Sequence, residues 1–166
     1  EECSAGKFRN GKPASNVEQA ACTSCQAGRF QPRAGMTSCV KCGRGKFRNN
    51  TVAAASDEAL ACSTCPPGTF QPSAGSVACV ACGAGKFRNQ EAASQPEGRA
   101  CSQCYPGRYQ NRAAQFKCKV KSLCPAGQGM ADPGGPEVDS VCVACTGNFW
   151  SATRGDQPCN NATRCR

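Results

Sequence analysis

Cysteines recur along this chain in a fixed alternation of long and short intervals. The segment 62–82, CSTCPPGTFQPSAGSVACVAC, holds two CxxC steps separated by a short loop, and the segment 22–42 repeats that arrangement. Looser copies begin at Cys101 and Cys142. Because equivalent positions return about every 40 residues, the chain reads as a linear array built from one small unit.

The residues between the cysteines cannot build an ordinary hydrophobic core. The 166 residues include 17 Cys but no Ile and only two Leu, Leu60 and Leu123. Covalent bonds must therefore replace the missing apolar contacts. A cysteine content this high is typical of extracellular or cell-surface proteins, which is the localisation we predict. No stretch approaches the roughly 18 to 20 apolar residues of a membrane span.

The cysteines are able to bind a metal ion or one another. The spacing of Cys22, Cys25, Cys39 and Cys42 is that of a zinc ribbon. A zinc assignment leaves many cysteines over, whereas pairing them in sequential order closes every loop and leaves only Cys165 unpaired. We therefore predict disulfides, no metal site and no cofactor, although crossed pairings across a CxxC step stay open.

Sequential pairing defines eight loops, numbered here 1 to 8 in chain order. Odd-numbered loops are long and even-numbered loops are short. The predicted pairs are Cys3 with Cys22, Cys25 with Cys39, Cys42 with Cys62, Cys65 with Cys79, Cys82 with Cys101, Cys104 with Cys118, Cys124 with Cys142, and Cys145 with Cys159.

Most loops open with the pattern C-x-x-G-x-F/Y. Glycine in the fourth place predicts a turn with positive φ, and the aromatic residue then begins a short strand. The glycines are Gly6, Gly28, Gly45, Gly68, Gly85 and Gly107. In loop 8 Asn148 takes the glycine position, and we expect it to adopt the left-handed conformation that Asn tolerates.

Three long loops repeat Lys-Phe-Arg after the turn. Alternation along a strand places the Phe on one face and both cations on the other, where they stay in water. Two interpretations stay open: a solvated face that keeps the protein soluble, or a basic stripe that binds an acidic partner. The stripe residues are Lys7, Arg9, Lys46, Arg48, Lys86 and Arg88.

The long loops also contain short Ala- and Glu-containing inserts. Ser94 and Glu97 have the spacing of a helix capping box, and Thr51 to Leu60 is the stretch richest in helix formers. We expect a helical turn or two at most, because so short a helix is marginal without packing.

The array divides into four repeats with a remainder. We predict repeat 1 over residues 3–41, repeat 2 over 42–81, repeat 3 over 82–123, a divergent repeat 4 over 124–164, and the start of a further repeat at 165–166. Repeat 4 differs by a five-residue linker, Lys119 to Leu123, and by the turn-rich insertion Asp132 to Pro136. The odd cysteine, Cys165, leads us to expect an excerpt of a longer protein.

Catalytic chemistry finds little support in these residues. The chain has no His, which excludes a Cys-His pair or a serine triad, and its 11 acidic residues are scattered over loops. No phosphate-binding loop precedes a helix, and no nucleic-acid partner is expected. We predict that the chain is not an enzyme.

Asn49 and Asn161 begin N-x-Thr sequons, the acceptor sites for N-glycosylation of extracellular proteins.

The repeated C-x-x-G-x-F/Y and C-x-x-C residues resemble the ephrin-receptor-like cysteine-rich repeats and, more distantly, tumour necrosis factor receptor modules. This resemblance implies a small disulfide-rich fold, mostly β and irregular, arranged as an elongated linear array of single-disulfide loops with short β-hairpins and little helix. It implies an extracellular structural or protein-interaction segment of a larger cell-surface, adhesion or filament-forming protein. The alternative is a ligand-binding receptor ectodomain.

The expected partners are other proteins, including further copies of the chain. The net charge of +9 adds acidic glycan as a less favoured partner. The tumour necrosis factor receptor modules carry a further Cys after the CxxC that this sequence lacks, so no ligand-contact residue is carried over from them.

Overall fold

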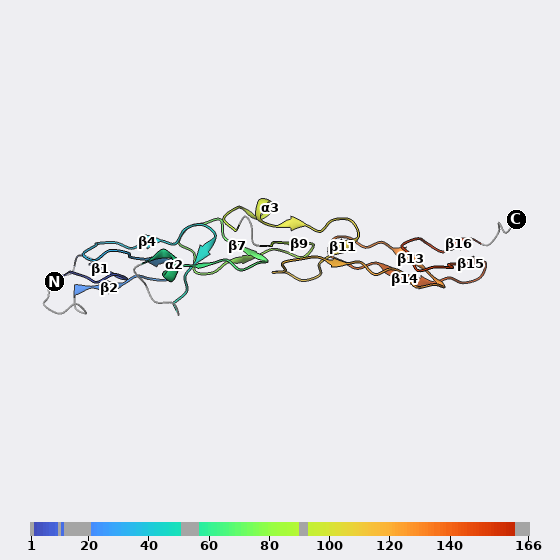
Figure 1. Ribbon diagram of the computed structural model, residues 1–166, viewed down its shortest axis with the longest axis horizontal. Coiled ribbons are helices and arrows are strands. Elements are labelled where there is room, and N and C mark those ends of the chain that lie inside the picture. The colour runs from blue at the N-terminus through green and yellow to red at the C-terminus, as the bar shows by residue number, and fades with distance from the viewer. Residues whose placement is uncertain (1, 10, 12–20, 51–56, 90–92, 162–166) are drawn as a thin grey trace. The chain divides into compact units, whose positions relative to one another are not determined.

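A computed structural model describes residues 2–9, 11, 21–50, 57–89 and 93–161 (Figure 1). Contacts divide the chain into two units. Unit 1 comprises Glu1–Cys82 and Arg88–Cys101, and unit 2 comprises Gly83–Phe87 and Ser102–Arg166. Within both units the described strands form two-stranded antiparallel hairpins, and the named helices of the described residues are two of four residues each. The expectation of a disulfide-rich, mostly β and irregular fold is confirmed.

Each hairpin joins the opening of one loop to the residues at or just after its closing cysteine, which lie in a CxxC step except after loops 6 and 8. In unit 1, β1 (Lys7–Phe8) pairs with β2 (Thr23–Ser24), β3 (Arg29–Phe30) with β4 (Val40–Lys41), β5 (Lys46–Phe47) with β6 (Ser63–Thr64), and β7 (Thr69–Phe70) with β8 (Val80–Ala81). In unit 2, β9 (Lys86–Phe87) pairs with β10 (Ser102–Gln103), β11 (Arg108–Tyr109) with β12 (Lys119–Val120), β13 (Gln128–Asp132) with β14 (Val141–Ala144), and β15 (Phe149–Trp150) with β16 (Asn160–Asn161).

The structure joins sixteen cysteines in sequential order. The eight bridges close loops 1 to 8, with Cα–Cα distances from 5.5 to 5.8 Å, which is the usual range for a disulfide. The four cysteines with zinc-ribbon spacing belong to three different bridges, and the described residues contain no cluster of metal-ligating side chains. Cys165 lies outside the described residues.

Backbone hydrogen bonds at the turn glycine connect each loop to the next. The Gly28 N–H donates to the carbonyl of Arg48 in loop 3 at 2.8 Å, and the Gly28 carbonyl accepts from the N–H of Cys42 at 2.9 Å. Gly28 has φ 77°, and a Cβ there would lie 2.1 Å from the Gly75 oxygen. Only glycine fits this position, because both the backbone angle and the close approach exclude a side chain.

The same two bonds recur from loop to loop. The equivalent N–H donations, 2.7 to 2.9 Å long, run from Gly6 to Gln31, Gly45 to Gln71, Gly68 to Arg88, Gly85 to Gln110, and Gly127 to Ser151. Loop 6 differs, because the Gly107 carbonyl accepts from the N–H of Lys121 instead of from a cysteine. The five-residue linker Lys119 to Leu123 thus interrupts the repeated contact.

Loop 8 makes its turn in a different way from the one expected. Gly147 has φ 65°, and Asn148 is not among the described residues with positive φ. The prediction for Asn148 was therefore wrong. A glycine was available one residue earlier, and glycine adopts the left-handed conformation at lower cost than asparagine does.

Aromatic rings of short loops cover the disulfides of long loops. In unit 1, Phe30 is buried with the Cys42–Cys62 bridge and Ala61. Phe70 is buried in the same way with the Cys82–Cys101 bridge. Each hydrophobic cluster therefore consists of one ring, one disulfide and one alanine, which is the small core that the composition allows.

The two described helices begin later than the sequence suggested. α2 (Glu58–Ala61) has Asp57 as its N-cap, whose carboxylate accepts from the Ala59 N–H at 2.9 Å. α3 (Glu97–Ala100) is preceded by Pro96, which provides no side-chain cap. The capping box predicted for Ser94 was wrong, because Glu97 is the first helical residue and not the third. None of the described helices has the length and apolar character that crossing a membrane requires.

The left-handed turn late in the short loops generates a prediction. Gly35 (φ 72°) and Gly75 (φ 80°) occupy this place in loops 2 and 4, and Ala114 (φ 59°) occupies it in loop 6. We expect Ala114→Gly to stabilise loop 6 by roughly 0.5–1 kcal/mol, because the left-handed strain of alanine exceeds the entropic cost of glycine. Gly75→Ala should destabilise loop 4 by about as much.

Amide hydrogen exchange within loops 4 and 6 measures both effects locally. Faster amide exchange in loop 6 of the Ala114→Gly variant would contradict the proposed backbone strain at Ala114.

Candidate functional site

The predicted basic stripe does not form a continuous exposed surface. Arg48 and Arg88 are 5% and 2% exposed, so the expectation that they stay in water was wrong. Strand β5 ends at Phe47, and the alternation of faces does not extend to the next residue. Lys7, Arg9, Lys46 and Lys86 are partly exposed.

Each buried arginine holds the turn of the preceding loop. One terminal nitrogen of Arg48 donates to the carbonyls of Cys25, Gln26 and Arg29 at 3.2, 2.7 and 2.9 Å. Arg88 makes the equivalent bonds to the carbonyls of Cys65 and Pro66 at 2.9 and 2.8 Å. Burial lowers the pKa of both guanidinium groups. Their role is to tie consecutive loops together.

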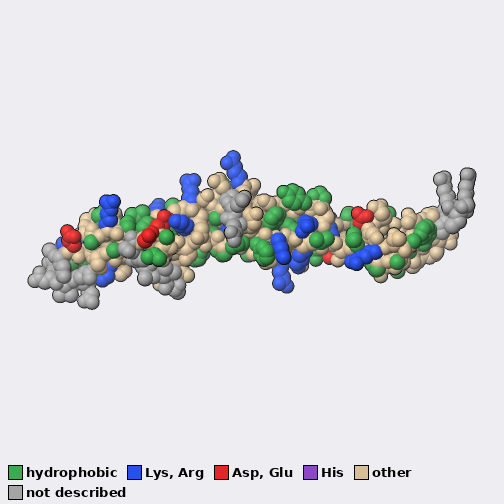
Figure 2. Space-filling view, in the orientation of Figure 1, with side chains coloured by type: hydrophobic (Ala, Val, Ile, Leu, Met, Phe, Trp, Pro, Cys, Tyr) green, Lys and Arg blue, Asp and Glu red, His purple; other side chains and the backbone are tan. Residues whose placement is uncertain are grey.

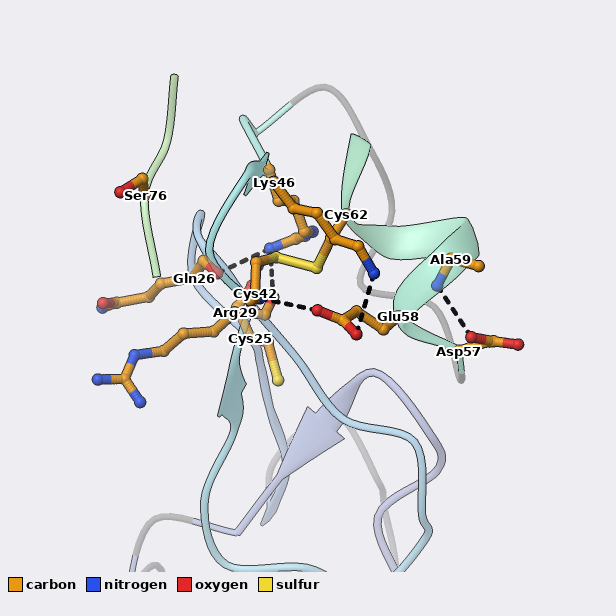
Figure 3. The surroundings of a disulfide bond; sticks show 12 residues. Cys25, Gln26, Arg29, Cys42, Lys46, Asp57, Glu58, Ala59, Cys62 and Ser76 are labelled. Carbon is orange, nitrogen blue, oxygen red and sulfur yellow. Dashed lines mark hydrogen bonds and ion pairs between the residues drawn. A yellow bond between two sulfur atoms is a disulfide. The ribbon is translucent and has the colours of Figure 1, made fainter. Parts of the chain in front are cut away.

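Lys46 forms an ion pair with the first residue of α2. Its Nζ lies 3.1 Å from Glu58, whose other carboxylate oxygen accepts from the Gly43 N–H at 2.7 Å. Figure 3 shows Lys46 reaching across to Glu58 beside the Cys42–Cys62 disulfide. The Gly43 amide and then Lys46 lower the pKa of Glu58. This acid offsets the charge of the central lysine in the proposed stripe.

Three glutamines perform a related task in the short loops, and sequence reasoning missed them. Gln31, Gln71 and Gln110 are buried, and their side-chain amides donate to the carbonyls of Ser38, Ala78 and Lys117. Their side-chain oxygens accept from the backbone N–H two residues later. The signal was present, because a Gln follows the aromatic residue in loops 2, 4 and 6.

The two sequon asparagines differ in exposure. Asn49 is half-buried, and Asn161 is exposed in β16. The threonines of both sequons, Thr51 and Thr163, lie outside the described residues. Glycosylation at these sites stays a prediction.

An open groove in unit 2 is the candidate binding site. It has a volume of about 580 Å³ and is lined by Tyr105, Arg108 and Lys121 on one part and by Gly134 to Pro136 on another. Two of its neighbours are hollows of about 220 and 440 Å³. The larger of these lies against Val120, Leu123 and Met130. The turn-rich insertion singled out in the sequence therefore forms part of a concave surface.

Lys121 and Asp139 fix the insertion to the linker between loops 6 and 7. The Lys121 ammonium donates to the carbonyls of Pro133 and Gly134, the latter at 2.6 Å. The Asp139 carboxylate accepts from the Ser122 N–H at 2.7 Å and its hydroxyl at 2.8 Å. These side-chain contacts stand beside the backbone bond that the Gln110 N–H donates to the Pro136 carbonyl at 2.8 Å.

Asp139 is the most perturbed titratable group of the described residues. The Ser122 amide is the largest cause, and the hydroxyl of Ser122, the Ser140 amide and the Tyr109 hydroxyl act in the same direction. Together they lower the pKa of Asp139 to about 2. Burial, followed by the charge of Asp139, raises the pKa of Tyr109. The junction therefore depends on a charged carboxylate.

Comparison with known proteins identifies the repeat. A family model described as tyrosine-protein kinase ephrin type A/B receptor-like matches residues 11–59 and again residues 53–98. The two matches together span more than half of the 166 residues. The chain belongs to the ephrin type A/B receptor-like family. This family consists of receptor-like interaction modules and not of enzymes.

Two solved structures resemble the whole ephrin-receptor-like chain. A chain in the crystal structure of the mouse RANKL–OPG complex is 20% identical over 96% of this chain and 88% of its own length, with a TM-score of 0.37. A chain in the human RANKL/OPG complex is 19% identical over 98% of this chain and 85% of its own, with a TM-score of 0.36. No curated protein sequence matches the chain.

The groove lies beyond the residues that match the ephrin-receptor-like family model. The matches end at residue 98, and the residues named above as groove lining begin at Tyr105. The glycine contacts, by contrast, occur both inside and outside the matched region. The groove is therefore an addition to the repeated scaffold.

The buried arginines generate a stability prediction. We expect Arg48→Met to destabilise unit 1 by about 2–4 kcal/mol, because three carbonyls lose a charged donor. Arg44→Met is the matched control. Arg44 is exposed, so its replacement should change the free energy of unfolding by no more than about 0.5 kcal/mol. Guanidinium denaturation with the disulfides intact measures both; equal effects would refute the bridging role.

The Asp139 junction generates a pH prediction. Its pKa is depressed in the folded chain, so the stabilisation is complete above the ordinary Asp pKa of about 3.9 and is lost as pH falls through about 2. We expect exchange of the Ser122 and Ser140 amides to accelerate across this window once intrinsic rates are corrected. Asp139→Asn should remove this transition; an unchanged profile would exclude the carboxylate as its source.

Proposed function

We propose that the chain is an extracellular structural and protein-interaction segment of a larger cell-surface, adhesion or filament-forming protein. The observation that supports this proposal is an exposed valine at the same place in two successive repeats. Val40 begins β4 and Val80 begins β8, and the two side chains are 49% and 50% exposed. In β12 Lys119 takes this place and Val120 follows it.

The valines differ from scattered surface apolar residues because their position is repeated. Val40 lies across the hairpin from Phe30 and Val80 from Phe70, and both rings are buried. Each valine thus extends a small apolar cluster to the surface. One exposed valine needs no explanation, but its recurrence in register offers a partner the same contact in two successive repeats.

A second candidate function is a ligand-binding receptor ectodomain. The groove of unit 2 favours it, because apolar residues and a turn-rich loop meet at one concave surface. This candidate requires contacts confined to one region. The first candidate requires contacts that repeat.

Photo-crosslinking distinguishes the two candidates. The chain itself serves as the probe, with p-benzoylphenylalanine placed singly at position 40, 80 or 120. We expect crosslinks between copies from positions 40 and 80, with yields that rise with protein concentration; Val120 lines a hollow beside the groove and reports on that surface instead. Lys41 and Ala81 follow Val40 and Val80 in the same strands and are also exposed. Consecutive residues of a strand point to opposite faces, so p-benzoylphenylalanine at position 41 or 81 should give weaker crosslinks.

Crosslinks from position 120 alone would favour the localised receptor surface. No crosslinks from positions 40 and 80 would overturn the proposal of self-association.

A further inference from the structure

We propose that loop 6 and its flanking strands bind a sulfated polysaccharide. The segment from Gly98 to Ala131 contains six cations and no acidic residue, although the whole chain has 11 acids. The cations are Arg99, Arg108, Arg112, Lys117, Lys119 and Lys121. In Figure 2 blue side chains stand out from the surface in the region that carries β11 in Figure 1. This concentration of one sign of charge favours a polyanion.

Three of these cations, Arg108, Lys117 and Lys121, line a groove. The hollows of about 580 and 220 Å³ share Tyr105 and Arg108 in their linings. Lys121 lines the first and Lys117 lines the second. No Asp or Glu is among the described residues that line either hollow. A bound chain would therefore meet successive positive charges without an intervening negative one.

Three of the lysines are held in place by neighbouring groups. The Lys117 ammonium lies 5.3 Å from the centre of the Phe116 ring, and that of Lys119 lies 5.6 Å from the Tyr109 ring. The Lys121 ammonium contacts the carbonyls described above. These contacts leave each charge intact while they restrict the side chain, so less conformational entropy is lost when an anion binds.

The Lys-Phe-Arg motifs lack this arrangement. Arg48 and Arg88 are buried under carbonyl groups, and Lys46 is paired with Glu58. Loop 6 instead has Arg108 exposed at the place where the short loops open. The surface with the greatest capacity for anions is therefore loop 6, and not the stripe that alternation had suggested.

The groove surface favours a sugar chain over an acidic peptide. Tyr105 is 69% exposed and lines both hollows beside Pro106 and Pro136 of the larger one. Flat exposed rings stack against the CH faces of sugars, and the open groove does not enclose an anchoring side chain of the kind that dominates peptide interfaces. The proposal rests on the extracellular setting of the proposed function, where sulfated polysaccharides are abundant polyanions.

Binding to immobilised heparin, measured by surface plasmon resonance at several salt concentrations, tests the proposal. We expect the triple variant Arg108→Gln, Lys117→Gln, Lys121→Gln to lose about tenfold or more in affinity. The slope of log K against log salt should fall by about 2, since each contact contributes roughly 0.7 to 0.9.

A matched control removes the same charge elsewhere. Arg33, Lys41 and Arg44 are exposed residues of unit 1, and their joint replacement by Gln should change heparin affinity by no more than about twofold if the site is local. Equal losses in the two triple variants would show that net charge alone controls binding and would overturn the site.

Two further measurements exclude misfolding and an acidic protein partner. The double variant Arg108→Gln, Lys117→Gln leaves the Lys121 contacts in place and should still lose affinity; unreduced mass verifies its disulfides. Tyr105→Ala should weaken heparin binding more than binding of polyglutamate of equal charge. If polyglutamate displaces heparin as well as a heparin oligosaccharide does, the polysaccharide site is refuted. Crosslinking at positions 40 and 80 stays independent of these outcomes, because neither residue lines the groove.

Discussion

The bond from the turn glycine into the following loop is the contact on which the array depends. Every disulfide joins two cysteines of the same loop, so covalent bonds close the loops without setting how one loop meets the next. That relation is set by the glycine N–H and carbonyl, as in the 2.8 Å bond from Gly28 to Arg48. All of these glycines have positive φ, which favours glycine, and at Gly28 a Cβ would also lie 2.1 Å from the Gly75 oxygen.

Buried polar side chains fill the interior and hold neighbouring segments together, as aliphatic side chains do in larger domains. Arg48 bonds to three carbonyls of loop 2, and Gln31 satisfies both donor and acceptor groups within its own loop. Such groups are tolerated inside a protein only when their hydrogen bonds are made. Here the tight turns supply many carbonyls without helical or sheet partners. The polar side chains and the turns therefore require one another.

The short sequence motifs predicted the turns and strands of this fold better than they predicted which side chains are exposed. The loop-opening glycine turns and the short strands after them follow from the local pattern C-x-x-G-x-F/Y. The burial of Arg48 could not be foreseen, because two-residue strands end before the alternation rule reaches that residue. Of the groove, the Asp132 to Pro136 insertion was recognisable as an irregularity. The contribution of Arg108 was not, because it depends on which loops lie beside it.

The interruption at loop 6 explains why the groove occurs there. Elsewhere the cysteine after a short loop donates its N–H to the preceding glycine carbonyl. The linker Lys119 to Leu123 places Lys121 against Gly107 instead. The side chains of Lys121 and Asp139 then join loop 7 to the linker, beside the backbone bond from the Gln110 N–H to the Pro136 carbonyl. Longer side-chain contacts leave room for a concave surface. A scaffold whose loops are otherwise closely joined can thus acquire a binding site by lengthening one linker.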